Sequence, residues 1–297
     1  MSASLPPLPR IPGYGAVQMS LRTVNQMEVT VFVNGKAEQF MVDTGASTSA
    51  MDEHEAMKDG VKPTTSDSPY GQYSYVMGQR LRTAIIDDLR AGSMDFGRGP
   101  IALYSEGRSD PMLLERSAAS RKMTGFLGAD VLLHYKAIIN CRNRQIFFPM
   151  GAKASKLGAV VAGMGFIRVP LREENGRELT VPCSLGGKSG RLLIDTGAFT
   201  TLLDAGIVSE LRMPVQRTKM SFVDFHGHRM DAALARVRDL MIGDYHLPPQ
   251  NLFVGGEALS ASASRIAETR IFGVFGADLL TTQHAIIDLE SMSLFLK

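Results

Sequence analysis

The sequence predicts an all-β protein made of two similar lobes, and two observations lead to this prediction. The chain is rich in glycine, with 29 glycines in 297 residues, yet it is not of low complexity. Such a composition is typical of a chain with many tight turns between strands. The chain also repeats itself once along its length. Two copies of about 150 residues suit two lobes that face each other better than a solenoid, which needs several copies of a short unit.

Length, charge and hydropathy exclude several classes of protein. A chain of 297 residues is long enough for two domains with a substantial core. The 32 Lys and Arg against 30 Asp and Glu leave a net charge of +2, without the basic bias of a nucleic-acid-binding protein. The longest apolar run, residues 157–167, is too short to span a bilayer, so we expect no membrane insertion.

The first residues predict a proline-rich arm over 1–15. This arm contains no apolar segment of the kind that signal peptides carry. The expected location is therefore cytoplasmic by default, or periplasmic or secreted if a leader has been removed.

Cysteine and histidine are too scarce for a metal or thiol centre. We expect the two cysteines, Cys141 and Cys183, to be buried thiols, because two cysteines make neither a disulfide scaffold nor a cysteine-based zinc site. The pair His226 and His228 has no third ligand nearby, which favours an exposed turn. The sequence carries no phosphate-binding loop and no nucleophile elbow. We therefore expect that no metal or organic cofactor is required.

The first repeated block ends on Asp-Thr-Gly-Ala. Residues 29–46 (VTVFVNGKAEQFMVDTGA) align without a gap with residues 181–198 (VPCSLGGKSGRLLIDTGA), 152 positions later. Each copy predicts a β-hairpin, because an Asn-Gly or Gly-Gly turn separates two strand-like segments. The two aspartates, Asp43 and Asp195, therefore each follow a buried strand.

A second repeated block closes each half. Residues 125–148 align without a gap with residues 273–296, and both begin with a glycine and two apolar residues before Gly-Ala-Asp. The middle of each half predicts a further β-hairpin, at 70–84 and at 220–233. We therefore divide the chain as follows: arm 1–15, first lobe 16–150, connection 151–165 and second lobe 166–297.

The paired aspartates predict acid–base chemistry. A single Asp-Thr-Gly is most often a turn, but two copies at equivalent places bring Asp43 and Asp195 together at a pseudo-two-fold axis. Two carboxylates in close contact do not both ionise readily, so the pair holds one proton. One carboxylate then acts as a base on a water that attacks a carbonyl, and the other carboxyl protonates the oxyanion.

The residues beside the aspartates suit that chemistry. Gly45 and Gly197 let the backbones approach closely and offer N–H donors to the carboxylates. Thr44 and Thr196 carry hydroxyls that can hydrogen-bond across the lobe interface. We therefore expect the two loops to be locked together.

These motifs resemble those of the aspartic peptidases of the pepsin and retropepsin type. The DTGA motif in both halves, followed by Phe-Leu-Gly or Val-Phe-Gly, is most similar to the bacterial retropepsin-like aspartyl proteases. The resemblance implies two β-barrel lobes related by a pseudo-two-fold axis, with the active site between them. It implies a catalytic dyad of Asp43 and Asp195. The residues that would support the dyad are Thr44, Gly45, Ala46, Thr196, Gly197 and Ala198.

The same resemblance implies an aspartic endopeptidase with a β-hairpin flap over its substrate. The candidates for flap or substrate contacts are Tyr73, Tyr75 and Phe225. Pepsins have one flap and retropepsins have two, and the sequence leaves both arrangements open. The expected partner is an extended polypeptide, and the expected state is a monomer with an intramolecular dyad. No nucleic acid is expected.

The sequence departs from the pepsin pattern after each Asp-Thr-Gly. Ala46 and Ala198 stand where pepsins have a hydroxyl residue, and a hydroxyl that donates to a carboxylate lowers its pKa. We therefore expect the dyad to titrate higher than in pepsin, with a less acidic optimum. The resemblance also implies that the repeated Asp130 and Asp278 are N-caps of the short helices that follow.

Two other functions fit parts of the pattern. A catalytically silent peptide-binding protein would have the same two-lobed fold with an idle dyad. A purely structural duplicated barrel does not explain why Asp, Thr and Gly recur together in both halves. An aspartic endopeptidase accounts for all of these residues.

Overall fold

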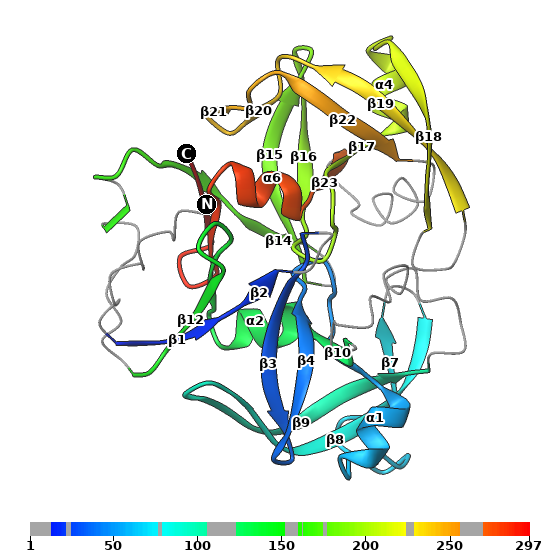
Figure 1. Ribbon diagram of the computed structural model, residues 1–297, viewed down its shortest axis with the longest axis vertical. Coiled ribbons are helices and arrows are strands. Elements are labelled where there is room, and N and C mark those ends of the chain that lie inside the picture. Colours follow the sequence, from blue (N-terminus) through cyan, green and yellow to red (C-terminus); the bar gives the residue numbers. More distant parts are fainter. Residues whose placement is uncertain are drawn as a thin grey trace, which may run out of the picture.

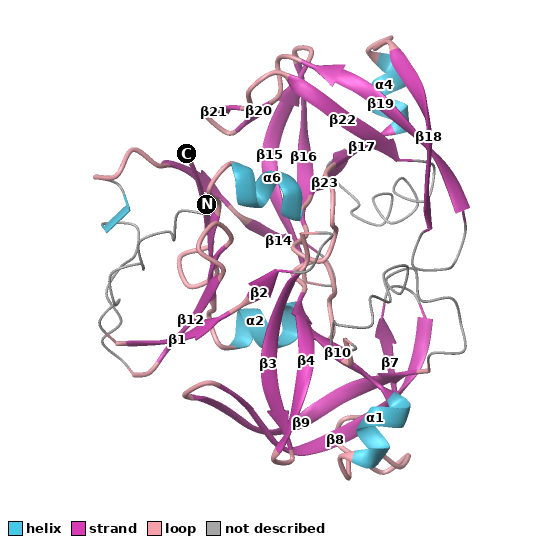
Figure 2. Cartoon of the chain, in the orientation of Figure 1, coloured by secondary structure: helices cyan, strands magenta, loops and turns pink. Residues whose placement is uncertain are grey.

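The computed structural model shows two β-sheet lobes joined by a third sheet (Figure 1). Short helices cover the sheets (Figure 2). The described residues are 13–21, 25–76, 79–105, 123–151, 160–161, 163–174, 177–223, 229–255 and 270–297. This architecture confirms the predicted all-β fold of two related lobes.

The first lobe is built on a nine-stranded sheet in the order β2-β3-β4-β10-β5-β9-β8-β6, with β7 paired to β8. Its strands are β2 (Ser20–Leu21), β3 (Met27–Val33), β4 (Lys36–Val42), β5 (Ala50–Asp52), β6 (Lys62–Pro63), β7 (Tyr73–Val76), β8 (Gln79–Ala91), β9 (Met94–Tyr104) and β10 (Gly125–Leu127). Its helices are α1 (Glu53–Lys58) and α2 (Ala129–His134).

The second lobe repeats this plan on a ten-stranded sheet in the order β18-β19-β22-β17-β23-β16-β15-β20-β21, with β14 paired to β15. Its strands are β14 (Arg172–Glu174), β15 (Glu178–Leu185), β16 (Lys188–Ile194), β17 (Leu202–Asp204), β18 (Val215–Val223), β19 (Arg229–Val237), β20 (Met241–Ile242), β21 (Tyr245–His246), β22 (Gln250–Gly255) and β23 (Ile271–Phe275). Its helices are α4 (Ala205–Glu210) and α6 (Ala277–Thr282).

A six-stranded sheet joins the lobes. Its order is β1 (Tyr14–Gln18), β12 (Gln145–Pro149), β11 (Ile138–Asn140), β24 (Ile286–Asp288), β25 (Ser293–Leu296) and β13 (Ile167–Pro170). Three strands come from each half, and the central pair places Ile139 opposite Ile287. The pseudo-two-fold axis therefore passes between β11 and β24.

Turn chemistry explains the hairpin that carries each aspartate. Asn34 and Gly35 both have positive φ, 49° and 84°, as do Gly186 and Gly187, at 56° and 75°. Two successive positive φ values are the requirement of a two-residue type I′ turn, which asparagine and glycine tolerate. The Asn-Gly and Gly-Gly dipeptides were therefore correctly predicted as hairpin turns.

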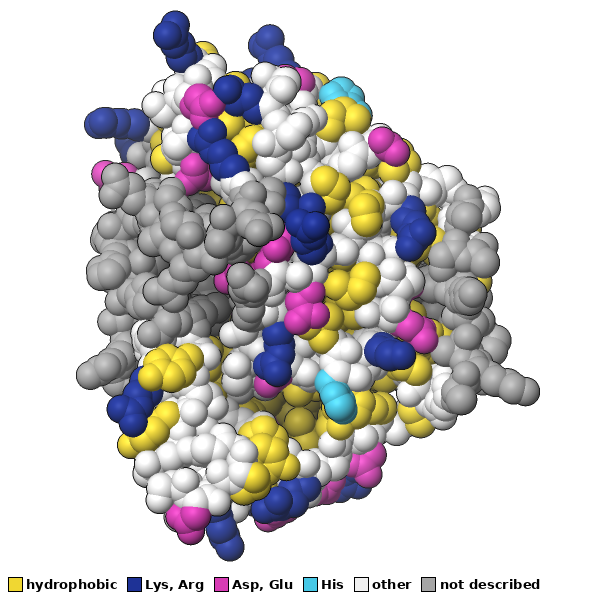
Figure 3. Space-filling model, turned by 180° about the vertical axis from the view of Figure 1, so that it is seen from behind, with side chains coloured by type: hydrophobic (Ala, Val, Ile, Leu, Met, Phe, Trp, Pro, Cys, Tyr) yellow, Lys and Arg dark blue, Asp and Glu magenta, His cyan; other side chains and the backbone are white. Residues whose placement is uncertain are grey.

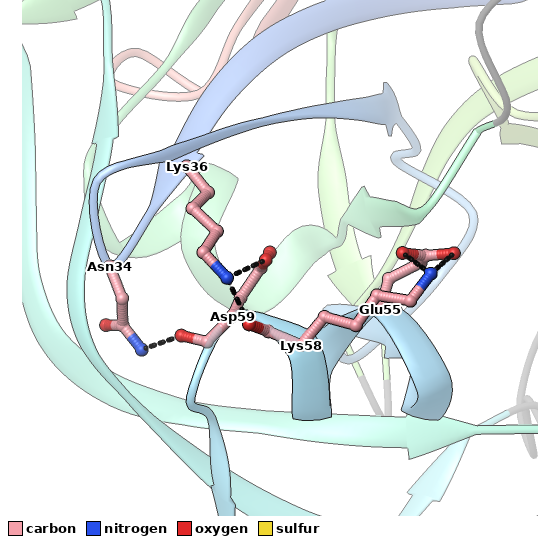
Figure 4. A network of polar contacts seen from close by, with 5 residues as sticks. All are labelled: Asn34, Lys36, Glu55, Lys58 and Asp59. Atoms are coloured by element: carbon pink, nitrogen blue, oxygen red, sulfur yellow. Dashed lines mark hydrogen bonds and ion pairs between the residues drawn. The ribbon is translucent and has the colours of Figure 1, made fainter.

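Polar contacts anchor the tip of the β3–β4 hairpin to the end of α1 (Figure 4). The Asn34 side-chain amide donates to the Asp59 carbonyl at 2.9 Å, and Lys36 forms an ion pair with Asp59 at 3.5 Å. Within α1, Lys58 pairs with Glu55 at 2.9 Å. These contacts hold the hairpin at the end that is remote from Asp43.

The core follows from the alternation of apolar residues along the strands. Valines 29, 31 and 33 of β3 are buried, and Phe40 and Val42 of β4 are fully buried. Cys141 and Cys183 are buried free thiols, as predicted. Among the described residues, no helix has the length and apolar character needed to cross a membrane. On the face shown in Figure 3, basic and acidic side chains are interspersed.

Candidate active site at the junction of the lobes

Asp43 and Asp195 each stand immediately after the strand that leads to the lobe junction. Asp43 follows β4 and its N–H donates to the Leu127 carbonyl at 3.0 Å, beyond the parallel pairing of β4 with β10. Asp195 follows β16 and its N–H donates to the Phe275 carbonyl at 3.2 Å, beyond the parallel pairing of β16 with β23. The same strand arrangement therefore positions both aspartates.

Each carboxyl lies against the glycine of the other lobe. A β-carbon on Gly45 would come within 2.3 Å of Asp195 Cγ, and one on Gly197 would come within 2.5 Å of Asp43 Cγ. Only glycine leaves room for such an approach. The two carboxyls also lie close enough for the charge of Asp195 to raise the pKa of Asp43. The structure thus brings the two aspartates together.

Backbone N–H groups of each loop hold its own carboxyl. Gly45 and Ala46 donate to Asp43 Oδ1 at 2.9 Å and 3.1 Å. In the second lobe, Gly197 and Ala198 donate to Asp195 Oδ1 at 2.8 Å and 2.9 Å. Hydrogen bonds of this kind stabilise the ionised carboxylate.

Thr44 and Thr196 join the two loops through four hydrogen bonds. Each backbone N–H donates to the hydroxyl of the other threonine at 3.0 Å. The Thr44 hydroxyl donates to the Ile194 carbonyl at 2.8 Å, and the Thr196 hydroxyl donates to the Val42 carbonyl at 2.6 Å. Both threonines are buried, so these bonds are shielded from water.

Burial raises the pKa of both carboxyls. Asp43 is 2% exposed, and its pKa is raised well above the usual range by burial and by the negative charge of Asp195. The pKa of the partly exposed Asp195 is raised by burial, against the lowering effect of the Ala198 and Gly197 N–H groups. The two groups titrate as a pair, so one proton stays on the dyad at a pH where separate aspartates would both be ionised.

The predicted N-cap role of Asp130 is wrong. The N-cap of α2 is Gly128, which makes no side-chain capping bond, and Asp130 lies inside the first turn. From there its carboxylate accepts the Ser49 N–H at 2.9 Å and the Ser49 hydroxyl at 2.6 Å. That hydroxyl accepts the Gly128 N–H at 2.8 Å. Asp130 therefore ties α2 to the loop that carries Asp43.

Asp278 makes the same connection in the second lobe and is likewise no N-cap. Gly276 is the N-cap of α6, and it too makes no side-chain capping bond. The Asp278 carboxylate accepts the Thr201 N–H at 2.8 Å and the Thr201 hydroxyl at 2.7 Å. The same hydroxyl accepts the Gly276 N–H at 3.0 Å. The cap prediction failed because it considered only the helix and not the loop that passes in front of it.

The first flap candidate forms a hairpin of β7 and β8, whose tip at residues 77–78 lies outside the described residues. Tyr73 and Tyr75 share one face and are 39% and 68% exposed. Val76 lies on the other face, is fully buried, and belongs to the same hydrophobic cluster as Ala46. Val76 could not be singled out from the sequence, because the register that decides the inward face is set by strand pairing. A substrate contact of either tyrosine stays a prediction.

The second flap candidate forms a hairpin of β18 and β19 on the same side of the molecule as β7 (right in Figure 1). Phe225 and the histidines 226 and 228 lie outside the described residues. Within the part of the chain that the structure describes, no group of three or more His, Cys, Asp or Glu side chains is arranged to hold a metal ion.

Comparisons with known proteins agree with this geometry. The model of a protein family described as aspartyl protease matches residues 28–118 and 181–279, one match in each half. No curated protein sequence matches the chain.

Two solved structures have a similar fold. The crystal structure of basic 7S globulin from soybean aligns with a TM-score of 0.50 and 10% identity, over 97% of this chain and 95% of that chain. The crystal structure of conglutin gamma, a basic 7S globulin from lupine seeds, aligns with a TM-score of 0.48 and 10% identity, over 96% and 95%. At this identity the soybean likeness shows the fold alone, which is the pepsin-like fold of two β-barrel lobes.

Proposed function

The chain belongs to the aspartyl protease family, and on that premise we propose that it is an aspartic endopeptidase that hydrolyses the peptide bonds of an extended polypeptide. The observation that carries the proposal is the mutual contact of the two DTGA loops. Each glycine lies against the carboxyl of the opposite lobe, so both carboxyls face one position at the lobe junction. A single water at that position is within reach of both groups.

The proposed reaction uses the proton that the dyad retains. The ionised carboxylate of the pair removes a proton from the water while the water oxygen attacks the carbonyl carbon of the scissile peptide. The protonated carboxyl gives its proton to the carbonyl oxygen, which forms a tetrahedral diol. The diol then collapses: one of its hydroxyls gives a proton to the ionised carboxylate, the C–N bond breaks, and the leaving nitrogen takes a proton from the protonated carboxyl, so the dyad again holds one proton. The products are a new carboxyl end and a new amine end.

The raised pKa of Asp43 supports a reaction in which one carboxyl is the proton donor and the other is the base. A proton donor must be protonated at the working pH, and burial together with the Asp195 charge favours the protonated form of Asp43. Four backbone N–H bonds hold the two carboxyls in place, and they leave each aspartate free to change its protonation state. No metal or organic cofactor takes part in these steps.

The proposed substrate lies extended between the two lobes. Backbone pairing with a strand of the β7–β8 or β18–β19 hairpin would hold such a chain without demanding one particular sequence. Because both aspartates belong to one chain, we propose that a monomer is sufficient for activity.

Cleavage of a denatured protein substrate across pH 3–8 tests this function. We expect the wild-type protein to cleave, and we expect Asp43→Asn and Asp195→Asn each to lose at least about a thousandfold in kcat/KM, because an amide can no longer shuttle the proton. A statine-type inhibitor should block the wild-type reaction. The matched control is Asp87→Asn, since the Asp87 side chain is 67% exposed and remote from the dyad in sequence.

The result that would overturn the proposal is cleavage that persists in either dyad variant. Binding of the unfolded substrate without cleavage by the wild type at any pH would instead support a catalytically silent peptide-binding protein.

A further inference from the structure

Gln26 is a buried polar side chain of the first lobe that reaches the active-site loop of the second. It lies immediately before β3 and is 3% exposed. Its side-chain amide nitrogen donates to the Gly197 carbonyl at 3.3 Å, across 171 positions of sequence. This contact joins the first lobe to the Asp-Thr-Gly of the second lobe.

The peptide unit that Gln26 holds also binds Asp195. The Gly197 carbonyl and the Ala198 N–H belong to one planar peptide group and point in opposite directions. Gln26 donates to the carbonyl side, and the N–H side donates to Asp195 Oδ1 at 2.9 Å. A donor on the carbonyl oxygen polarises the peptide and strengthens its N–H as a donor. The two bonds therefore form a chain from Gln26 to the Asp195 carboxylate.

The same loop also touches the other carboxyl. Gly197 packs so closely against Asp43 that a β-carbon on Gly197 would lie 2.5 Å from Asp43 Cγ. A small rotation of the Gly197 peptide would therefore disturb Asp195 through its hydrogen bond and Asp43 through this contact. The Gln26 amide opposes such a rotation.

The position equivalent to Gln26 in the second lobe cannot donate the same side-chain hydrogen bond. The residue 152 positions after Gln26 is Glu178, whose carboxylate has no amide N–H to donate. The neighbouring Arg177 reaches the loop of the first lobe instead, and its guanidinium donates to the Ser47 carbonyl at 3.3 Å from an exposed position. The contact from Gln26 is buried, and the contact from Arg177 is open to water.

We propose that Gln26 is a positioning residue of the dyad, which holds the Gly197–Ala198 peptide against Asp195 and makes the two carboxyls inequivalent. This inference deepens the proposed peptidase function and rests on it for the kinetic part of its test. The proposed role of Gln26 concerns the geometry of one loop. A direct measurement of how the two aspartates titrate therefore tests this role without any measurement of peptidase activity.

The first experiment compares Gln26→Met with Gln39→Met. Methionine keeps the length of glutamine and removes the donor, and Gln39 is a matched control because it is also buried and donates its amide to Thr30 at 2.8 Å within its own sheet. We expect Gln26→Met to lower kcat about tenfold with less than a twofold change in KM, the effect of losing about one hydrogen bond that acts on the transition state. The Gln39 variant should keep the wild-type kcat.

The pH profile gives a signature that a general loss of stability would not produce. The Ala198 N–H lowers the pKa of Asp195, so a weaker bond raises it, and the acidic limb of the kcat/KM profile should move to higher pH in Gln26→Met. The charged group that acts on Asp43 is the Asp195 carboxylate, and the Asp43 side chain in turn lowers the pKa of Asp195 as a hydrogen-bond partner. The proposal would be overturned if both the acidic limb of the kcat/KM profile and kcat stayed unchanged in Gln26→Met. It would also be overturned if Gln39→Met changed both quantities by the same amount.

The second experiment does not depend on peptidase activity. Carbon-13 NMR of labelled aspartate carboxyls follows the titration of the dyad in the wild type and in Gln26→Met, and we expect the lower-titrating step to move to higher pH in the variant. If Gln26→Met does not fold, Gln26→Asn withdraws the amide by one methylene and should give the same displacement. A wild type that cleaves nothing overturns the proposed function, whereas coincident titration curves overturn the role of Gln26.

Discussion

At the residue scale, the two DTGA loops show how small side chains let two carboxyls approach each other closely. Gly45 and Gly197 are required because the opposite carboxyl occupies the space of a side chain. Ala46 and Ala198 contribute backbone N–H bonds and no hydroxyl. The pKa values of both aspartates are raised above their ordinary value, with burial as the largest cause. The expected difference from pepsin stays a prediction.

The missing hydroxyl gives a prediction about pH. Activity requires one proton to leave the dyad, so a new donor to the carboxylate should move the acidic limb of the kcat/KM profile to lower pH. Ala198 is partly exposed, and a serine hydroxyl there would be a new donor, so we expect Ala198→Ser to move this limb down by about one pH unit. Rate profiles of the two proteins over pH 2–8 measure the difference. A wild-type optimum near pH 2, or a limb that moves upward in the variant, would contradict this explanation.

At the element scale, the short helices α2 and α6 support the dyad through a carboxylate that faces a loop. Asp130 and Asp278 each accept an N–H and a hydroxyl from the loop beyond the aspartate, and that hydroxyl accepts the N–H of Gly128 or Gly276. The repeated pattern explains why Gly-Ala-Asp recurs in both halves. Its aspartate supports the loop that follows Asp43 or Asp195.

This support predicts a graded loss of stability. Asp130→Ala removes the acceptor of the Ser49 N–H and hydroxyl, and we expect it to lower the free energy of unfolding by about 2–3 kcal/mol. Ser49→Ala keeps the N–H bond to Asp130 and should cost about 1 kcal/mol. Urea denaturation at neutral pH measures both values. An Asp130→Ala protein as stable as one with Asp87→Ala would show that the carboxylate does not hold the loop.

At the scale of the whole molecule, two connections bring the candidate site together from two lobes. The six-stranded sheet joins them on one side, and the hydroxyls of Thr44 and Thr196 join them at the dyad. The duplication extends to the backbone: Lys136 and His284, which are equivalent in the two halves, have φ of 50° and 53°. The lobes are therefore two copies of one folding plan rather than two barrels that happen to be adjacent.

The threonine bonds give a prediction about the lobe interface. Thr44→Val leaves the buried Ile194 carbonyl and Thr196 N–H without their partner, and we expect a loss of about 2–4 kcal/mol in unfolding free energy. The Thr196→Val change should cost a similar amount. In the double variant the second substitution should cost less than the first, because the loops are already separated. Denaturant titrations of all four proteins provide this cycle, and strictly additive losses would show that the threonines act independently.

Much of the fold and the centre of the site could be predicted because repetition and turn chemistry are local properties. The Asn34-Gly35 dipeptide specifies a type I′ turn by its own backbone preferences, and two DTGA motifs at equivalent places indicate a symmetric pair. The contacts of Gln26, Val76 and Asp130 could not be predicted, because each reaches a residue that is distant in sequence. The wrong N-cap prediction for Asp130 illustrates this. Its neighbours in the helix could be read from the sequence, but the loop at Ser49 that it binds could not.

By itself, the sequence determined that the chain holds two copies of one β-rich unit and that each copy contributes one aspartate and its flanking glycine. It could do so because strand, turn and motif depend on residues within a few positions of one another. Only the tertiary structure decided which carbonyl the buried Gln26 holds, which face of the first hairpin is buried, and how closely each glycine approaches the opposite carboxyl. These features depend on strand register and on the docking of two lobes, and the free energy of both comes from contacts between distant parts of the chain.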